Sequence, residues 1–142
     1  MPIRHIVVAY DASPPARRAL SFAAELAQSF HSSITLVHAI HIPVTPPEAA
    51  LAGWADLLAA EERAGESLVE EAVRSLKQKG LKADSRVVVG APAEQVAEAA
   101  TTSDVDLVVA GTTGKGAMAR VFLGSVTTRL LHICPKPVLV VP

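Results

Sequence analysis

The sequence predicts a single α/β domain: an open, parallel, five-stranded sheet with helices on both of its faces. Short apolar segments rich in β-branched residues alternate with segments whose apolar residues recur at helical spacing, in the order β-α-β-α-β-α-β-α-β. Continuous apolar strands are typical of a parallel sheet that is buried on both faces. The 142 residues, 50% of them hydrophobic, suffice for one sizeable core, so residues 1–142 are treated as one domain.

The first strand is expected from Ile3 to Ala9, around the apolar run Ile6-Val7-Val8. Ser13 offers an N-cap oxygen, and Pro14 fits the first helical position, where its missing N–H costs nothing. The second strand is expected from Ser33 to Ile40. One face of the helix between these strands is apolar and should point inward: Ala19, Ala23, Leu26, Ala27 and Phe30.

Residues 41–50 hold three prolines and are expected to form a loop. A long amphipathic helix should follow, from about Glu48 to Lys79. Gly65 is expected to loosen the middle of this helix, and Gly80 to end it as the C′ residue. Its best apolar face comprises Leu68, Val69, Ala72, Val73 and Leu76.

The second half of the chain repeats the alternation. Strands are expected from Ala83 to Val89, from Asp106 to Ala110 and from Val138 to Val141, and a helix from Ser125 to Ile133. Another helix should begin at Gly90-Ala91-Pro92 and bury Ala93, Val96, Ala97 and Ala100. In open parallel sheets, ligands bind beyond the carboxyl ends of the strands, where the strand order reverses.

Composition excludes several classes of function. The net charge is −1, from 13 basic and 14 acidic residues, and no basic run suggests nucleic acid as a partner. The apolar stretches fall short of the roughly 20 residues that span a bilayer, and the N-terminus does not resemble a signal peptide. The single cysteine, Cys134, allows no internal disulfide. We therefore expect a cytoplasmic protein that binds neither nucleic acid nor membrane.

A glycine-rich loop is the clearest candidate site. Gly111 and Gly114 follow the fourth strand, and nine residues later Gly124-Ser125 opens a helix. Glycines let backbone N–H groups approach a ligand closely, and a helix N-terminus adds free N–H donors and a positive dipole end. Taken singly, Gly111 could be a turn glycine and Gly124-Ser125 an ordinary N-cap. Together they favour a site for phosphate groups.

Three further residues border this loop. Lys115 could meet phosphate oxygens, although an isolated loop lysine is usually solvated, and Val126 and Thr127 would add backbone N–H groups. Asp11 follows the first strand and should lie on the same edge of the sheet. It could bind a ligand or a phosphate-bound metal, or it could simply shape the turn that leads into the first helix, and both readings stay open.

Several kinds of chemistry have no sequence signature in this chain. The turn Asp11-Ala12-Ser13 is not a dinucleotide-binding fingerprint, and no GxxxxGK[ST] motif occurs. No nucleophile elbow and no zinc-ligand spacing are present. His38 and His41 form no recognisable metal cluster. With phosphate-holding groups but no evident general base, the chain is expected to hydrolyse a nucleotide slowly at most.

These features together resemble the universal stress protein family along essentially the whole chain. The spacing G-x2-G-x9-G-[ST], met by Gly111, Gly114, Gly124 and Ser125, marks the ATP-binding branch of that family. The other segments that carry the resemblance are Ile6 to Ser13, Leu36 to Ala39, Val89 to Pro92, Asp106 to Gly111 and Pro137 to Val141.

The resemblance implies a Rossmann-like sheet of the adenine nucleotide alpha hydrolase type, with strand order 3-2-1-4-5, and ATP bound with Mg²⁺. Ala9 and Asp11 would border the nucleotide, and the backbone of Ala39 would meet the adenine. The ribose and phosphates would meet Gly111, Gly114 and Lys115, and the phosphate oxygens would be held by Gly124, Ser125, Val126 and Thr127.

Relatives commonly form homodimers through the last strand, and an apolar edge such as Val138 to Val141 invites pairing with a second copy. The function implied is a dimeric stress or signalling module whose nucleotide occupancy tunes conformation or partner binding. A nucleotide-independent interaction or chaperone-like dimer is the alternative. An ATP-consuming enzyme of adenylate-forming or pyrophosphatase type fits less well, because Asp11-Ala12-Ser13 lacks the Ser-Gly-Gly-type loop of such enzymes.

Overall fold

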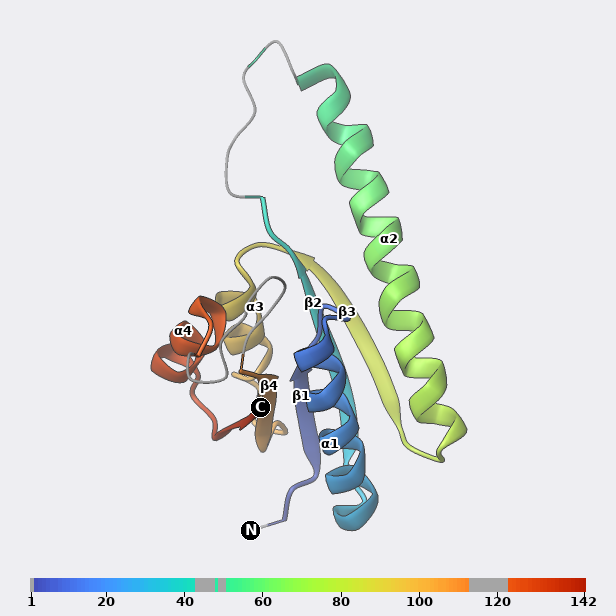
Figure 1. Ribbon diagram of the computed structural model, residues 1–142, viewed down its shortest axis with the longest axis vertical. Coiled ribbons are helices and arrows are strands. Elements are labelled where there is room, and N and C mark those ends of the chain that lie inside the picture. Colours follow the sequence, from blue (N-terminus) through green and yellow to red (C-terminus); the bar gives the residue numbers. More distant parts are fainter. Residues whose placement is uncertain (1, 43–47, 49–50, 113–122) are drawn as a thin grey trace.

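The computed structural model describes residues 2–42, 48, 51–112 and 123–142. Five parallel strands form one sheet in the order β3-β2-β1-β4-β5, which confirms the expected topology (Figure 1). The elements, in chain order, are β1 (His5–Ala9), α1 (Pro14–Phe30), β2 (Ser33–Ile40), α2 (Leu51–Gln78), β3 (Ala83–Val89), α3 (Pro92–Ala99), β4 (Leu107–Gly111), α4 (Ser125–Ile133) and β5 (Val138–Val141).

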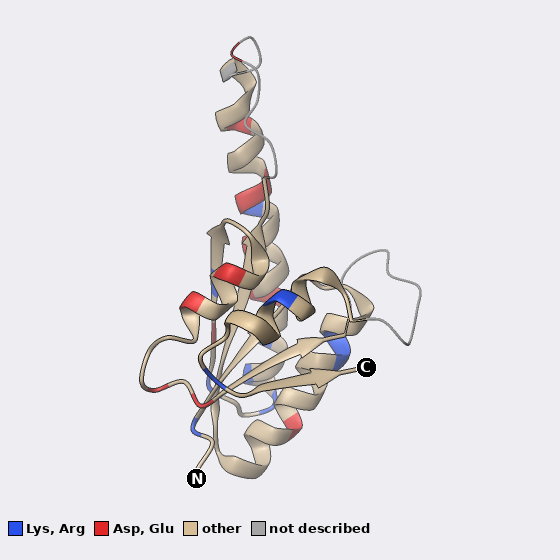
Figure 2. Cartoon of the chain, turned by 90° about the vertical axis from the view of Figure 1, so that its left-hand side faces the viewer, with Lys and Arg blue, Asp and Glu red and all other residues tan. Residues whose placement is uncertain are grey.

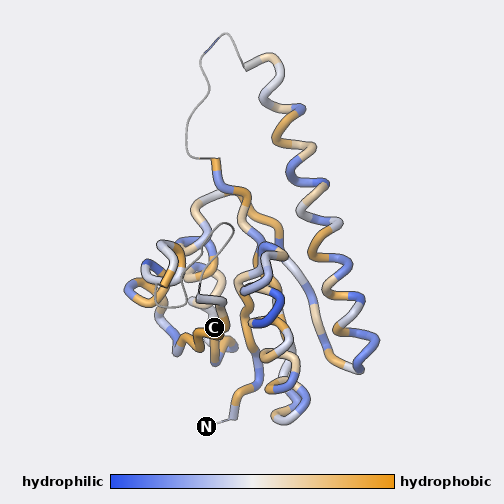
Figure 3. Tube along the Cα trace, in the orientation of Figure 1, coloured by the Kyte–Doolittle hydropathy of each residue, from blue (hydrophilic) through white to orange (hydrophobic). Residues whose placement is uncertain are grey.

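Helices cover both faces of the sheet. Helices α1 and α2 lie on one face, and α3 and α4 lie on the other (Figures 1 and 2). Because successive side chains of a strand point to opposite faces, β1 serves two cores. Ile6 and Val8 pack with α1 and α2, and Val7 packs with α3 and α4. Figure 3 shows the resulting pattern, with hydrophobic residues concentrated along the strands and on the inner sides of the helices.

Helix α1 begins as expected. The Ser13 hydroxyl accepts a hydrogen bond from the Ala16 N–H at 3.3 Å, and prolines occupy the start of the helix. Ala19, Ala23 and Ala27 are fully buried. The prediction for Phe30 was wrong, since this side chain is 50% exposed. Phe30 is the last residue of the helix, where the chain turns away through the left-handed His31, so helical spacing alone does not bring it into the core.

Helix α2 ends in a Schellman motif. Gly80, with φ of +81°, donates to the Lys77 carbonyl, and the Leu81 N–H donates to the Leu76 carbonyl at 3.2 Å. The predicted role of Gly80 is therefore confirmed. Helix α2 runs unbroken through Gly65, and whether this glycine loosens the helix stays a prediction.

Gly65 lets α2 approach the sheet closely. A Cβ at this position would lie 2.9 Å from Cδ2 of His38 on β2 and 3.2 Å from Cγ1 of Val87 on β3. Gly65 also marks the point where α2 first becomes buried, since no described residue of the helix before it is buried. The preceding turns extend past the end of the sheet, as Figure 1 shows. At about 1.5 Å per residue in a helix and about 3.3 Å in a strand, α2 is much longer than β3.

The amino edge of the sheet carries a hydrogen-bonded polar network. The two ring nitrogens of His5 contact Asp104 at 3.0 Å and the Thr35 hydroxyl at 2.8 Å. Thr35 in turn donates to Asp84, and the Asp106 carboxylate accepts the His5 N–H at 3.2 Å. The network joins β1, β2 and β3 to the start of β4, on the edge opposite the expected site. None of the described helices is long and apolar enough to cross a membrane.

Two glycines of α2 provide a matched test of this packing. Gly53→Ala should raise the free energy of unfolding by up to about 0.5 kcal/mol, because alanine favours a helix and nothing lies within 4 Å of the added methyl group. Gly65→Ala brings the same propensity but a contact with His38 at 2.9 Å, and should lower stability by ~1 kcal/mol or more. Urea unfolding of both variants measures the difference. Equal stabilities would contradict the close-approach explanation.

Candidate functional site

A pocket lies at the carboxyl ends of β1 and β4, two neighbouring strands. The chain leaves β1 for α1 on one face of the sheet and leaves β4 for α4 on the other face, so the two connections diverge and open a crevice between them. The walls formed by described residues enclose about 110 Å³. The lining residues are Ala9, Tyr10, Asp11, Ala16, Val37, Ala39, Pro92, Val96, Ala110, Gly111, Val126 and Thr127.

Most of the predicted site residues meet in this pocket. Those that line it are Ala9, Asp11, Ala39, Gly111, Val126 and Thr127. Gly124 and Ser125 lie at the N-terminus of α4 beside the pocket but do not line it. Gly114 and Lys115 lie outside the described residues.

Gly111 is required by packing between β4 and α1. A Cβ on Gly111 would lie 2.8 Å from both the carbonyl carbon and the Cβ of Pro15, and 2.9 Å from the Pro15 oxygen. Gly111 does not have a positive φ, unlike Gly80 and Gly90, so it is the close approach of Pro15 and not a left-handed backbone that requires glycine here. The missing side chain allows the first turn of α1 to lie directly against the end of β4.

Thr127 fastens α4 to the same point. Its side chain is 4% exposed, and its hydroxyl donates a hydrogen bond of 2.7 Å to the Gly111 carbonyl. The hydroxyl proton is therefore engaged in an internal hydrogen bond, and only the backbone N–H of Thr127 remains as a donor for a ligand.

The N-terminus of α4 presents several backbone donors. Its N-cap, Gly124, donates to the Thr112 carbonyl at 2.7 Å, and the first bond within the helix runs from the Thr128 N–H to the Gly124 carbonyl at 2.9 Å. No described residue accepts the N–H groups of Ser125, Val126 or Thr127. Unpaired N–H groups and the positive end of the helix dipole are the features that attract anions at helix N-termini in general.

Asp11 shapes the turn that leads into α1. Its Oδ1 accepts the Ser13 N–H at 2.9 Å, and the intervening Ala12 has a φ of +60°. This structural role is thus confirmed for one carboxylate oxygen. No described group bonds the other oxygen, so the ligand role remains a prediction. His38 makes a local hydrogen bond of 2.9 Å between its Nδ1 and the Tyr10 carbonyl.

Opposite the N-terminus of α4, the pocket has an apolar part, which we call the apolar slot. It is formed by Val37 and Ala39 on β2, Ala110 on β4, and Pro92 and Val96 on α3. Of these residues, only Ala39 was predicted to belong to the site. Val37 and Pro92 could have been found by position, because each borders the carboxyl end of a strand next to the predicted site. No Lys or Arg is among the described lining residues, so backbone groups supply the positive potential.

Helices α3 and α4 are tied together beside the pocket. Arg129 Nε donates to Glu94 Oε1 at 2.9 Å, and this hydrogen bond holds the pKa of Glu94 below its ordinary value. Both side chains are exposed, so the ion pair contributes little to the free energy of unfolding. It links α3 to α4 beside the pocket. Within the described ranges, no group of three His, Cys, Asp or Glu side chains is arranged to hold a metal.

The bond between Thr127 and Gly111 can be tested by substitution. Thr127→Val keeps the shape of the side chain but leaves the Gly111 carbonyl without this donor, and should lower the free energy of unfolding by about 1–2 kcal/mol. Thr127→Ser should lose less, because the hydroxyl remains. Thr128→Val, at an exposed position of the same helix, is the control and should change stability little. If Thr127→Val and Thr128→Val are equally stable, the bond does not hold α4 in place.

Comparison with solved structures extends the description of the fold. The universal stress protein UspA from Lactobacillus plantarum superposes with a TM-score of 0.90 at 22% identity, covering 100% of this chain and 99% of the other. A universal stress protein from Archaeoglobus fulgidus in complex with dAMP gives a TM-score of 0.69 at 25% identity, with 100% of both chains covered. A universal stress protein in complex with cAMP gives 0.69 at 25% identity, covering 99% and 98%.

Sequence comparison gives the same result. A universal stress protein from Mycolicibacterium smegmatis is 33% identical over 137 residues, which is 96% of this chain and 95% of the relative. A second, from Thermus aquaticus, is 32% identical over 149 residues and 96% of each chain. The family model for the universal stress protein family matches residues 2–142. This chain therefore belongs to the universal stress protein family.

Proposed function

We propose that this protein is an ATP-binding stress-response module in which nucleotide occupancy tunes conformation or the choice of partner. The observation that carries the proposal is a juxtaposition at the carboxyl ends of β1 and β4. There an apolar slot adjoins the first turn of α4, whose N–H groups have no acceptor among the described residues. A base and a phosphate chain need these two environments side by side.

The slot suits a planar base. It is narrow, it is lined by small or apolar side chains, and the β2 backbone at Ala39 forms part of its wall. The whole pocket encloses about 110 Å³, which would hold a ring system rather than a whole nucleotide, so the phosphates would extend over Val126 toward the α4 N-terminus. Ala9, Asp11 and Gly111 would border the ribose, and Gly114 and Lys115 are proposed to lie along the phosphates. The dAMP and cAMP complexes of the two relatives support an adenine nucleotide.

A divalent ion fits this arrangement. Mg²⁺ usually keeps several waters and binds one or two carboxylates together with phosphate oxygens. Asp11 is the only carboxylate among the described residues of the pocket, and one of its oxygens is bound to no described group. Asp11 would thus hold a phosphate-bound Mg²⁺, which would offset phosphate charge. Because Asp11 is also tied to the Ser13 N–H, we expect slow hydrolysis at most.

Val126→Asp separates phosphate binding from base binding. Val126 is 38% exposed in the first turn of α4, where a carboxylate is favourable for the helix but repels phosphate. We expect ATP to bind at least about tenfold more weakly, with adenosine affinity and thermal stability little changed. Isothermal titration calorimetry of both ligands gives the comparison. Two results together would reject the proposal: the unmodified chain binds no adenine nucleotide near 1 mM, and chromatography detects no nucleotide released on denaturation.

We also propose a homodimer through β5. The carbonyls of Pro137 and Val141 accept hydrogen bonds from the N–H groups of Val108 and Thr112, at and just after β4. Because backbone groups of successive strand residues point in opposite directions, those of Val138 and Val140 face the open edge. All four residues of β5 are only partly buried in the single chain. An open apolar edge pairs readily with a copy of itself around a two-fold axis.

Val140→Pro tests this assembly. Proline removes the outward N–H of Val140 while leaving the pairing of β5 with β4 intact, so the dimer should dissociate at concentrations where the unmodified chain is dimeric. Val140→Ala keeps the N–H and should remain dimeric. Light scattering after size exclusion reports the mass, and circular dichroism checks the fold. A folded Val140→Pro variant that stays dimeric would exclude pairing through this edge.

A further inference from the structure

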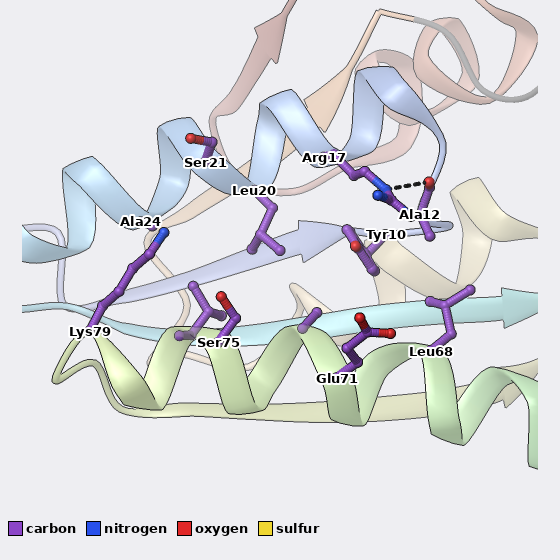
Figure 4. Close-up of a pocket in the computed structure, with 12 residues that line it drawn as sticks. Tyr10, Ala12, Arg17, Leu20, Ser21, Ala24, Leu68, Glu71, Ser75 and Lys79 are labelled. Atoms are coloured by element: carbon purple, nitrogen blue, oxygen red, sulfur yellow. Dashed lines mark hydrogen bonds between the residues drawn. The ribbon is translucent and has the colours of Figure 1, made fainter.

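A second cavity lies on the other face of the sheet, between α1 and α2. It encloses about 420 Å³, within the range typical of small-molecule sites. Figure 4 shows its walls: α1 above, α2 below, and Tyr10 at the end of β1 between them. We call this cavity the α1–α2 groove. It shares Tyr10 with the candidate nucleotide pocket but is otherwise lined by different residues.

Tyr10 is largely buried, but its hydroxyl oxygen is accessible from outside and has no partner among the described residues. The residue is 9% exposed, its backbone groups are bound to Val37 and His38, and no described group bonds its hydroxyl. Burial raises the pKa of Tyr10 above its ordinary value; Arg17 opposes this increase, and Glu71 and Asp11 add to it, so the hydroxyl stays protonated at neutral pH. The hydroxyl borders the groove, where it is free to donate a hydrogen bond to a bound ligand.

Two opposite charges flank this hydroxyl without pairing with each other. Arg17 lies on α1 and Glu71 on α2, and in Figure 4 both lie at the Tyr10 end of the groove. The Arg17 Nε donates to the Ala12 carbonyl at 2.9 Å, which holds the guanidinium on the α1 side. Of the two ion pairs found among the described residues, neither involves Arg17 or Glu71.

The groove behind these charges is apolar at its floor. Leu20 and Ala24 from α1 and Ala72 and Leu76 from α2 line it and belong to one packed apolar cluster. A purely anionic ligand would meet Glu71, and a purely cationic ligand would meet Arg17. A ligand that carries both charged groups on one carbon atom, together with an apolar group, matches the whole arrangement.

We propose that the α1–α2 groove binds a free α-amino acid with an apolar side chain. Its carboxylate would lie on the Arg17 guanidinium, which suits two-point binding of a carboxylate. Its ammonium group would lie on Glu71, and the Tyr10 hydroxyl would donate to the carboxylate. The side chain would extend over Ala72 toward Leu76. Lys79 closes the far end of the groove, about 12 Å along α2 from Glu71, and is beyond the reach of the charged end of an amino acid.

The experiment compares L-leucine with two analogues, on the full chain freed of small molecules. 4-Methylpentanoate lacks the ammonium group, and 3-methylbutylamine lacks the carboxylate. Calorimetry should show L-leucine binding at or below ~1 mM, with each analogue about tenfold weaker or more, since a hydrogen bond to a charged group is lost. Equal binding of leucine and either analogue, or no binding of L-leucine, L-methionine or L-phenylalanine at ~10 mM, would overturn the proposal.

Variants locate the site. Arg17→Gln and Glu71→Gln should each weaken L-leucine about tenfold or more, and Tyr10→Phe several-fold, whereas the matched control Lys79→Gln should bind normally. Saturating AMP should not displace leucine. Displacement by AMP, or undiminished binding by both Arg17→Gln and Glu71→Gln, would place the amino acid elsewhere. If the two variants instead lose thermal stability and the unmodified chain binds no amino acid, Arg17 and Glu71 form a structural pair and the proposal fails.

Discussion

The approach of the α1 backbone to Gly111 is the contact on which the arrangement of the candidate site depends. At this point β4 ends, the first turn of α1 lies against it through Pro15, and α4 is fastened to it through Thr127. One helix from each face of the sheet is therefore positioned by a single residue of the strand between them. A side chain at Gly111 would push α1 away and move the N-terminus of α4 relative to the pocket, so fold and site share one steric requirement.

The two ends of the parallel strands, which we call the amino edge and the carboxyl edge of the sheet, are organised differently. At the amino edge, His5, Thr35 and the neighbouring carboxylates satisfy one another. At the carboxyl edge, the N–H groups that open α4 and the Tyr10 hydroxyl have no partners among the described residues. Polar groups that can bind a ligand thus lie at the carboxyl ends of the strands, where the connections to α1 and α4 lead to opposite faces of the sheet. At the amino ends, the polar side chains are hydrogen-bonded to one another. This asymmetry is general for open parallel sheets.

Most of the fold could be predicted from the sequence because its strands and helices are strongly periodic and its caps are local. The Ser13 N-cap and the Gly80 C′ residue depend only on a few neighbouring residues. The packing roles of Gly65 and Gly111 could not be predicted, because each glycine is required by a segment distant in sequence, Gly65 by β2 and β3 and Gly111 by α1. Asp11 could not be resolved from sequence, since a turn and a ligand use the same carboxylate. The α1–α2 groove was not anticipated, because opposite charges on two helices become neighbours only in the folded chain.

Helix α2 has two halves with different support. The half after Gly65 is held by the sheet, whereas residues 51–64 extend past it without a buried residue among those described. That segment is close to the length, ~12–15 residues, at which isolated helices are marginal in water. Its hydrogen bonds can therefore open without any loss of the core, while those around Val69 and Leu76 open only with the domain. Amide hydrogen exchange along this one continuous helix would then report two different free energies of opening. The boundary between them would lie at Gly65, where the helix comes into contact with the sheet.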